Sequence, residues 1–208
     1  SIKQSGIPFQ MPTGEERARQ QAAVLHALYL IYSEGYTSSS GSELQRVELT
    51  GEAIRLTRIV HRVLPDDGEV AGLLALMLLI DARRPARADA AGELVTLDVQ
   101  DRTLWDRGLV AEGVAVLNAA MGKGRVGEYR IQAAIAALHD QAPAAEDTDW
   151  RQILALYGWS RSAEIRSSGS TAPSRRRWQK ALPPGWRSSM RSRNLCAATT
   201  AYTPSGRT

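Results

Sequence analysis

Along most of this chain, apolar residues recur every three or four positions, the spacing that places them on one side of an α-helix. Glycine, proline and clusters of serine, which favour turns, separate the periodic segments. The pattern therefore predicts an all-α protein. The predicted helices cover about residues 14–34, 50–64, 68–83, 101–121, 128–140 and 148–159.

The third predicted helix contains the segment LLALMLLI, residues 73–80, which is apolar on every side. A helix without a polar face is stable only when other helices surround it. Asp67, just before this helix, is a residue type that accepts hydrogen bonds from the free amides of a first helical turn. We therefore expect the helix to begin next to Asp67 and to form the centre of a helical bundle.

The last two predicted helices mix alanine with large apolar residues, as do the antiparallel helix pairs that stack in repeat solenoids. One such pair cannot bury both of its faces, so a further repeat would be expected after it. Instead the apolar period stops after Trp159, and the chain becomes rich in serine, arginine and proline. This organisation predicts a linker (1–14), a helical domain (15–122), a truncated tetratricopeptide-like helix pair (127–159) and an irregular basic tail (160–208), which is either disordered or translated out of frame.

The positive charge of the chain is concentrated in that tail. Residues 160–208 hold nine arginines and one lysine against one acid, a net charge of +9, whereas the whole chain carries +4 and residues 1–159 therefore carry −5. An arginine-rich segment with tryptophans can bind nucleic acid non-specifically through phosphate contacts and stacking. The tail therefore leaves nucleic-acid binding open as an alternative function, while the acidic remainder does not favour it.

Cysteine content and hydropathy indicate a cytoplasmic protein. The single cysteine, Cys196, excludes an internal disulfide and suits a reducing compartment. The most apolar run, residues 70–80, is about half as long as a membrane-spanning helix, and no apolar leader opens the chain. We therefore expect no contact with a membrane.

The stretch QDRTLWDRGLVAEG, residues 100–113, gathers acids and arginines around one tryptophan and is the clearest candidate for chemistry. On a continuous helix, Asp101 and Glu112 would share a face at a separation of roughly 16 Å, because each residue adds about 1.5 Å. Carboxylates that work as a pair in glycoside hydrolysis need a separation of about 5–10 Å. The spacing therefore favours a structural network, with Arg102 and Asp106 paired along the helix surface, over an active site.

The sequence shows no pattern typical of a metal or nucleotide site. The histidines, His26, His61 and His139, fall on three separate predicted helices without a second ligand at a metal-binding spacing. The sequence GKGRVG follows no strand and lacks a Gly-Lys-Ser/Thr motif. We therefore predict a protein that is not an enzyme, with no catalytic residue, no metal site and no cofactor. An enzyme that uses the Asp/Arg/Trp stretch stays open as a second alternative.

Four segments, residues 22–41, 52–87, 100–113 and 129–157, together resemble the C-terminal extension of a group of bacterial extracytoplasmic-function RNA polymerase sigma factors. The opening SIKQSGIPF resembles the junction that follows the helix-turn-helix of sigma region four in the same family. The resemblance implies a helical extension that ends in tetratricopeptide-like repeats and modulates transcription initiation through protein contacts. Its implied partners are sigma regions two and four, the RNA polymerase core or a regulatory protein. Promoter DNA would be reached only through regions two and four, which this chain lacks.

The polar motifs within those segments are our candidates for an interaction site or a structural network. Asp81, Arg83 and Arg84 are the expected partners that connect the 100–113 stretch to the loop after the third helix. The resemblance assigns none of the candidates a catalytic role. The candidates are Glu34, Tyr36, Asp81, Arg83, Arg84, Asp101, Arg102, Trp105 and Asp106.

Overall fold

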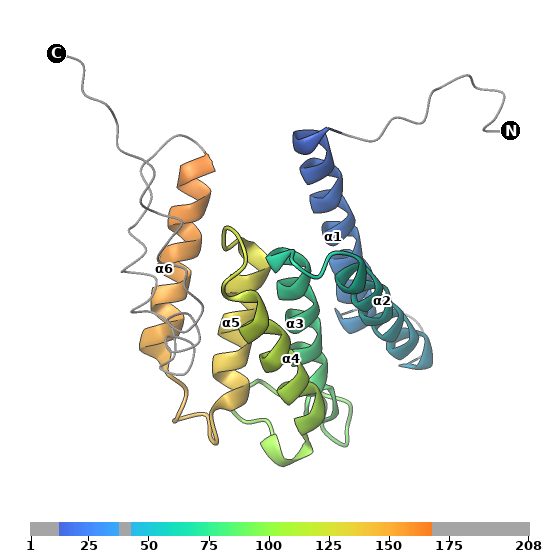
Figure 1. Ribbon diagram of the computed structural model, residues 1–208. Coiled ribbons are helices and arrows are strands. Elements are labelled where there is room, and N and C mark those ends of the chain that lie inside the picture. Colours follow the sequence, from blue (N-terminus) through green and yellow to red (C-terminus); the bar gives the residue numbers. More distant parts are fainter. Residues whose placement is uncertain (1–12, 38–42, 168–208) are drawn as a thin grey trace, which may run out of the picture. The chain divides into compact units, whose positions relative to one another are not determined.

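The computed structural model describes residues 13–37 and 43–167, and for residues 43–46 and 159–167 it describes the backbone alone. Within these ranges the chain forms six α-helices and two short 3-10 helices, without a named strand (Figure 1). The predicted all-α class is therefore confirmed. The elements are α1 (Gly14–Thr37), α2 (Glu43–Val63), α3 (Gly68–Ala82), η2 (Arg84–Ala86), η3 (Arg102–Leu104), α4 (Arg107–Ala120), α5 (Glu128–Gln141) and α6 (Trp150–Ser167).

The described residues divide into two compact units, one that ends at Ala53 and one that begins at Ile54. In the first unit, α1 continues past its predicted end at about residue 34 to Thr37. The rings of Tyr32 and Tyr36 stack on this helix, with their centroids 5.7 Å apart. α2 begins in the first unit and ends in the second, and it starts at Glu43, earlier than the sequence period predicts.

In the second unit, α3 is the central helix, as its apolar sequence predicts. Twelve of its fifteen residues are buried. Asp67 caps the helix, because its Oδ1 accepts hydrogen bonds from the amides of Glu69 at 2.9 Å and Val70 at 3.0 Å. α4 and α5 both pack against α3, and α6 packs against α5 (Figure 1). α3 is therefore the helix against which both α4 and α5 are held.

The prediction of one continuous helix over residues 101–121 is wrong for its first residues, because the α-helix begins only at Arg107. Asp101 and Asp106 both have an extended backbone, and the side chain of each accepts a hydrogen bond from an amide two or three residues later, at 2.9 and 3.0 Å. Two N-caps in close succession break the segment into the single turn η3 and the longer helix α4. Asp101 and Glu112 therefore do not share one helix, and Asp106 caps α4 where a pair with Arg102 was predicted.

The end predicted for the last helix is also wrong. α6 continues to Ser167, so helical backbone extends past Trp159 into the segment expected to be an irregular tail. Residues 160–167 contain no glycine or proline, and these are the residues that most often end a helix. The predictions for residues 1–12 and 168–208, Cys196 included, lie outside the described residues.

Candidate functional site

Arg102, one of the predicted polar residues, is only 8% exposed and closes the end of α5. Its Nη1 donates hydrogen bonds to the main-chain carbonyls of His139 at 2.6 Å and Ala142 at 2.9 Å. The guanidinium carbon also lies 4.6 Å from the ring centroid of Trp105. The last carbonyls of a helix have no donor within the helix, and a cation there compensates the negative end of the helix dipole. Arg102 is therefore a C-terminal cap that η3 supplies to α5.

Asp140, in the last turn of α5, is a buried acid that sequence reasoning missed. Its side chain is fully buried, and among the described residues neither carboxylate oxygen accepts a hydrogen bond. The Nε of Arg83 lies 3.4 Å from Oδ1. Burial raises the pKa of Asp140 to about 7, although Arg83, Arg102 and Arg107 lower it. Arg83, Arg102, Trp105 and Asp140 form what we name the Arg102 cluster.

The remaining candidates of the second unit hold the junction between α3 and η3. Arg84 pairs with Asp81 at the end of α3, with Nε 2.9 Å from Oδ1. The amide of Asp106 donates to the carbonyl of Ala82 at 2.9 Å. Trp105 is 3% exposed, and its indole nitrogen has no hydrogen-bond partner within the described ranges. The expected connection between this stretch and the loop after α3 is thus made through the main chain, while Asp81 pairs locally.

Glu34 and Tyr36 belong to the first unit, where they lie in the last turns of α1. Glu34 is exposed, and Tyr36 is half-buried against Tyr32. Their part in an interaction site stays a prediction.

Sequence reasoning also missed a second buried arginine, Arg130, at the start of α5. It is 1% exposed, and its Nε donates to Oε1 of Glu69 at 2.9 Å. Its Nη1 donates to the carbonyls of Ala120 at 3.1 Å and Lys123 at 2.5 Å. Glu69 in turn accepts hydrogen bonds from two main-chain amides where α5 begins, at 2.9 and 3.0 Å. Glu69 and Arg130, which we name the Arg130 cluster, therefore join the start of α3, the end of α4 and the start of α5.

Three glycines leave the room that the Arg130 cluster occupies. A Cβ atom on Gly72 would lie 2.6 Å from Cγ and 2.7 Å from the main-chain nitrogen of Arg130, and one on Gly68 would lie 2.5 Å from its Cζ. A Cβ atom on Gly127 would lie 2.4 Å from Oε2 of Glu69. Real Cβ atoms essentially never approach other atoms so closely. At Gly68 and Gly72 a Cβ atom would also meet main-chain atoms, at 2.8 Å and 2.7 Å, so the close approach of the chain there depends on glycine. At Gly127 it would meet only the side chain of Glu69.

The helical period of α5 contains a signal for both missed residues. Arg130 lies four residues before the buried Ala134, and Asp140 lies seven residues after the buried Ala133. Both charges therefore fall on faces that the period directs inward, where a charged group needs a partner. The helical period of α5 does not identify the partner of Arg130, because that partner, Glu69, lies 61 positions away along the chain.

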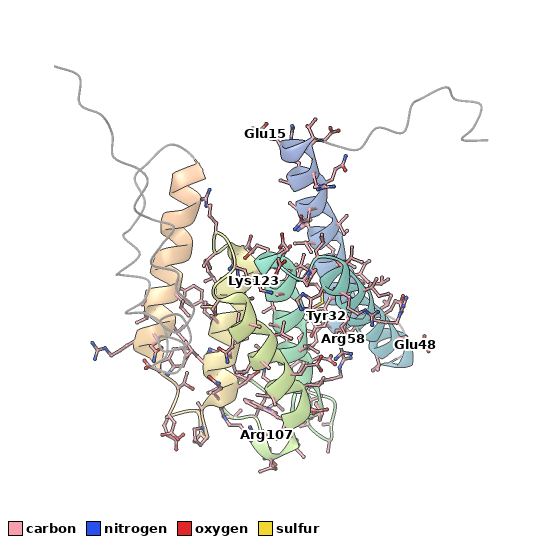
Figure 2. All side chains as sticks on the ribbon, in the orientation of Figure 1. Glu15, Tyr32, Glu48, Arg58, Arg107 and Lys123 are labelled. Atoms are coloured by element: carbon pink, nitrogen blue, oxygen red, sulfur yellow. The ribbon has the colours of Figure 1, made fainter. Side chains whose placement is uncertain are left out.

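The two clusters lie at opposite ends of α3 and α4. Figure 2 shows Arg107 at the start of α4 and Lys123 just beyond its end. Arg107 donates to the carbonyl of Arg102 at 2.9 Å, whereas the carbonyl of Lys123 accepts from Arg130. Each end of this helical unit is thus fixed by a buried arginine that supplies donors to carbonyls at or just beyond the end of another helix.

The two acids whose spacing was considered in the sequence, Asp101 and Glu112, are not brought together among the described residues. Asp101 and Glu112 lie on separate elements, and Glu112 pairs with Arg58 of α2 at 2.7 Å. In the part of the chain that the structure describes, no group of three histidines, cysteines or acids is placed to hold a metal ion. The described helices include none that is both long and apolar enough to cross a membrane. The arginines of the two clusters donate hydrogen bonds to carbonyls at helix ends, and in this way they hold neighbouring helices together.

Residues 20–121 match a family of unknown function, DUF6596. The chain is 46% identical over 156 residues to an uncharacterized protein of Rhizobium meliloti (strain 1021), and the match covers 75% of this chain but only 37% of that relative. No solved structure matches the chain significantly. The family match ends at Met121, before the helix that carries Arg130 and Asp140.

Replacing Asp106 with alanine is expected to lower the free energy of unfolding by about 1 kcal/mol, because α4 loses its N-cap. Asp101→Ala is the matched control, since Asp101 caps only the single turn η3, and we expect about half that loss or less. Urea unfolding followed by circular dichroism measures both. Equal losses for the two variants would show that α4 does not depend on Asp106 in particular.

Proposed function

We propose that this chain is a regulatory, non-enzymatic helical domain of an alternative bacterial RNA polymerase sigma factor and acts through protein contacts in the cytoplasm. The resemblance of residues 22–41, 52–87, 100–113 and 129–157 to the C-terminal extensions of such factors supports the proposal. The proposed partners are sigma regions two and four, the polymerase core or a regulatory protein. The matching family and the Rhizobium meliloti relative carry no functional description.

The observation that carries the proposal is that the charged residues of the 81–106 motifs bind helix ends or one another. Arg102 caps α5, Asp106 caps α4 and Asp81 pairs with Arg84. An enzyme would need several such groups directed together at a site that a substrate can reach. Charges that brace helix ends instead support a scaffold that presents a surface to another protein.

An exposed apolar strip on α6 is the surface that best suits such a contact. Trp150, Leu154 and Tyr157, which we name the α6 strip, are 57%, 67% and 54% exposed. Their spacing places them on one side of the helix, next to the side on which Ile153 and Leu156 are buried. Apolar residues that gather on a surface mark sites of protein interaction.

The proposal is tested by the binding of the purified chain to core RNA polymerase and to sigma regions two and four of the bacterium that encodes it. Biolayer interferometry measures the binding, and run-off transcription is the second readout. We expect Trp150→Ser combined with Leu154→Ser to weaken binding by about tenfold or more, because large apolar residues dominate protein interfaces. Leu94→Ser is the control, since Leu94 is 72% exposed but lies in the loop between η2 and η3.

A chain that binds neither polymerase nor the sigma regions, and leaves transcription unchanged, would contradict the proposal. Binding to DNA alone, with an affinity that falls steeply as salt is added, would support the nucleic-acid alternative. Equal weakening by the Leu94 control would remove the α6 strip as the contact surface.

A further inference from the structure

The end of α5 contains a buried carboxyl group, that of Asp140, which among the described residues makes no hydrogen bond that would hold the helix in place. The carboxyl group of Asp140 is fully buried, and its oxygens accept no hydrogen bond in the described ranges. Arg102, which is close by, directs its Nη1 to two main-chain carbonyls. The carboxyl group also sits in the last turn of a helix, where the dipole is negative. Arg83 comes within ion-pair distance, at 3.4 Å from Oδ1, but without a hydrogen bond it compensates a buried negative charge only in part. A neutral carboxylic acid needs no such compensation.

We propose that the carboxyl group of Asp140 is a proton switch that sets how firmly the end of α5 is held against η3 and α3. While the proton is bound, no negative charge is buried, and Arg102 holds the last turn of α5 through its two carbonyl contacts. When the proton leaves, the buried carboxylate attracts Arg83 and Arg102, and Arg102 has to divide its donors between the carboxylate and the carbonyls. The loop to α6 begins at Ala142, so the same change reaches the α5–α6 pair.

Charged groups lie near Asp140 on several neighbouring elements. Three arginines lower its pKa, but burial outweighs them and raises the pKa to about 7. The pKa of the neighbouring histidine is lowered, first by burial and then by two of these arginines. The groups are Arg83 at the end of α3, Arg102 in η3, Arg107 at the start of α4, His139 on α5, and Glu146 in the loop after α5, which acts on Arg102.

The sign of the pH dependence follows from the state that binds the proton more tightly. In an opened form Asp140 meets water and titrates near its ordinary pKa of 3.8, whereas the closed form keeps its proton up to about pH 7. Between these values the closed form binds more protons, so opening becomes more favourable as the pH rises and stops changing above about pH 7. From this group alone, the equilibrium constant for opening should rise roughly a hundredfold between pH 5 and pH 8.

Two measurements on the full chain test the switch. Carbon-13 NMR of the Asp140 carboxyl group should give a titration midpoint near pH 7 in the unmodified protein. Hydrogen exchange of residues 136–142, compared at equal pH, should be slower in Asp140→Asn by roughly tenfold at pH 5 and by roughly a thousandfold at pH 8, so the ratio to the unmodified protein should grow about a hundredfold between the two pH values. Asp147→Asn, which neutralises an exposed acid of the loop after α5, should match the unmodified protein at both pH values.

A carboxyl midpoint below pH 5 would overturn the proposal. So would an exchange ratio between the unmodified protein and Asp140→Asn that is the same at pH 5 and pH 8. If Asp140→Asn does not fold, the titration of the unmodified protein decides the question without it.

Discussion

Replacing Arg130 with methionine is expected to lower the free energy of unfolding by about 3–5 kcal/mol, a large part of the stability of an ordinary domain. Methionine fills much of the same volume, but it leaves Glu69 without its cation and removes the donors to the carbonyls of Ala120 and Lys123. An unpaired buried polar group costs more than the lost hydrogen bond itself, because it has also been removed from water. Urea unfolding measures the loss directly.

Two variants separate the contributions of charge and shape at this position. Arg125→Met is the control, because its side chain is exposed and only its carbonyl contacts Arg130, so we expect a change within about 0.5 kcal/mol. Arg130→Lys keeps the positive charge, but one ammonium group cannot reach Glu69 and the carbonyls together, so most of the loss should remain. A methionine variant that loses less than about 1 kcal/mol would contradict the role of Arg130 as the link between these helices.

Replacing Gly72 with alanine is expected to destabilise the protein by about 1–3 kcal/mol, the usual range for an overfilled core. In an unhindered helix the same change stabilises by about 0.5–1 kcal/mol, because glycine loses more backbone entropy on folding. At Gly72 the new methyl group would meet the main-chain nitrogen of Arg130 at 2.7 Å. Main-chain atoms cannot rotate away, so α3 and α5 would have to move apart.

Gly51→Ala is the matched control for this prediction. Gly51 also lies within a helix, α2, but a Cβ atom there would have nothing within 4 Å. We expect Gly51→Ala to leave stability unchanged or to raise it by about 0.5–1 kcal/mol. Thermal unfolding of both variants compares the signs, and a stabilising effect at Gly72 would mean that α3 and α5 are not in close contact there.

Much of the fold could be predicted from the sequence because the helices are amphipathic or, in α3, wholly apolar. The period placed α3 at the centre and Asp67 at its start, and both predictions are confirmed. It failed at Asp101 and Asp106, two N-caps five positions apart that each start a separate helix. Hydrophobic spacing records which side of a helix is buried, but it does not record a change of backbone conformation at a cap.

The candidate site was predicted less completely, and the reason is the distance along the chain between partners. Arg102 and Trp105 stood out because several charges surround one tryptophan within a short stretch. The missed residues are isolated charges within alanine-rich or leucine-rich segments, and their partners lie on other elements. They are Glu69 in α3 and Arg130 and Asp140 in α5. The sequence shows that a charge faces inward, whereas only the packed helices show what it meets.

The link between Arg130 and the end of α4 limits where this polypeptide can be shortened. A truncated product that stops at Met121, where the family match ends, would lack the donors that close α4. It would also lack the helix that covers Gly72. An expression clone designed to yield a minimal domain should therefore extend through α5, even though similarity to the family does not.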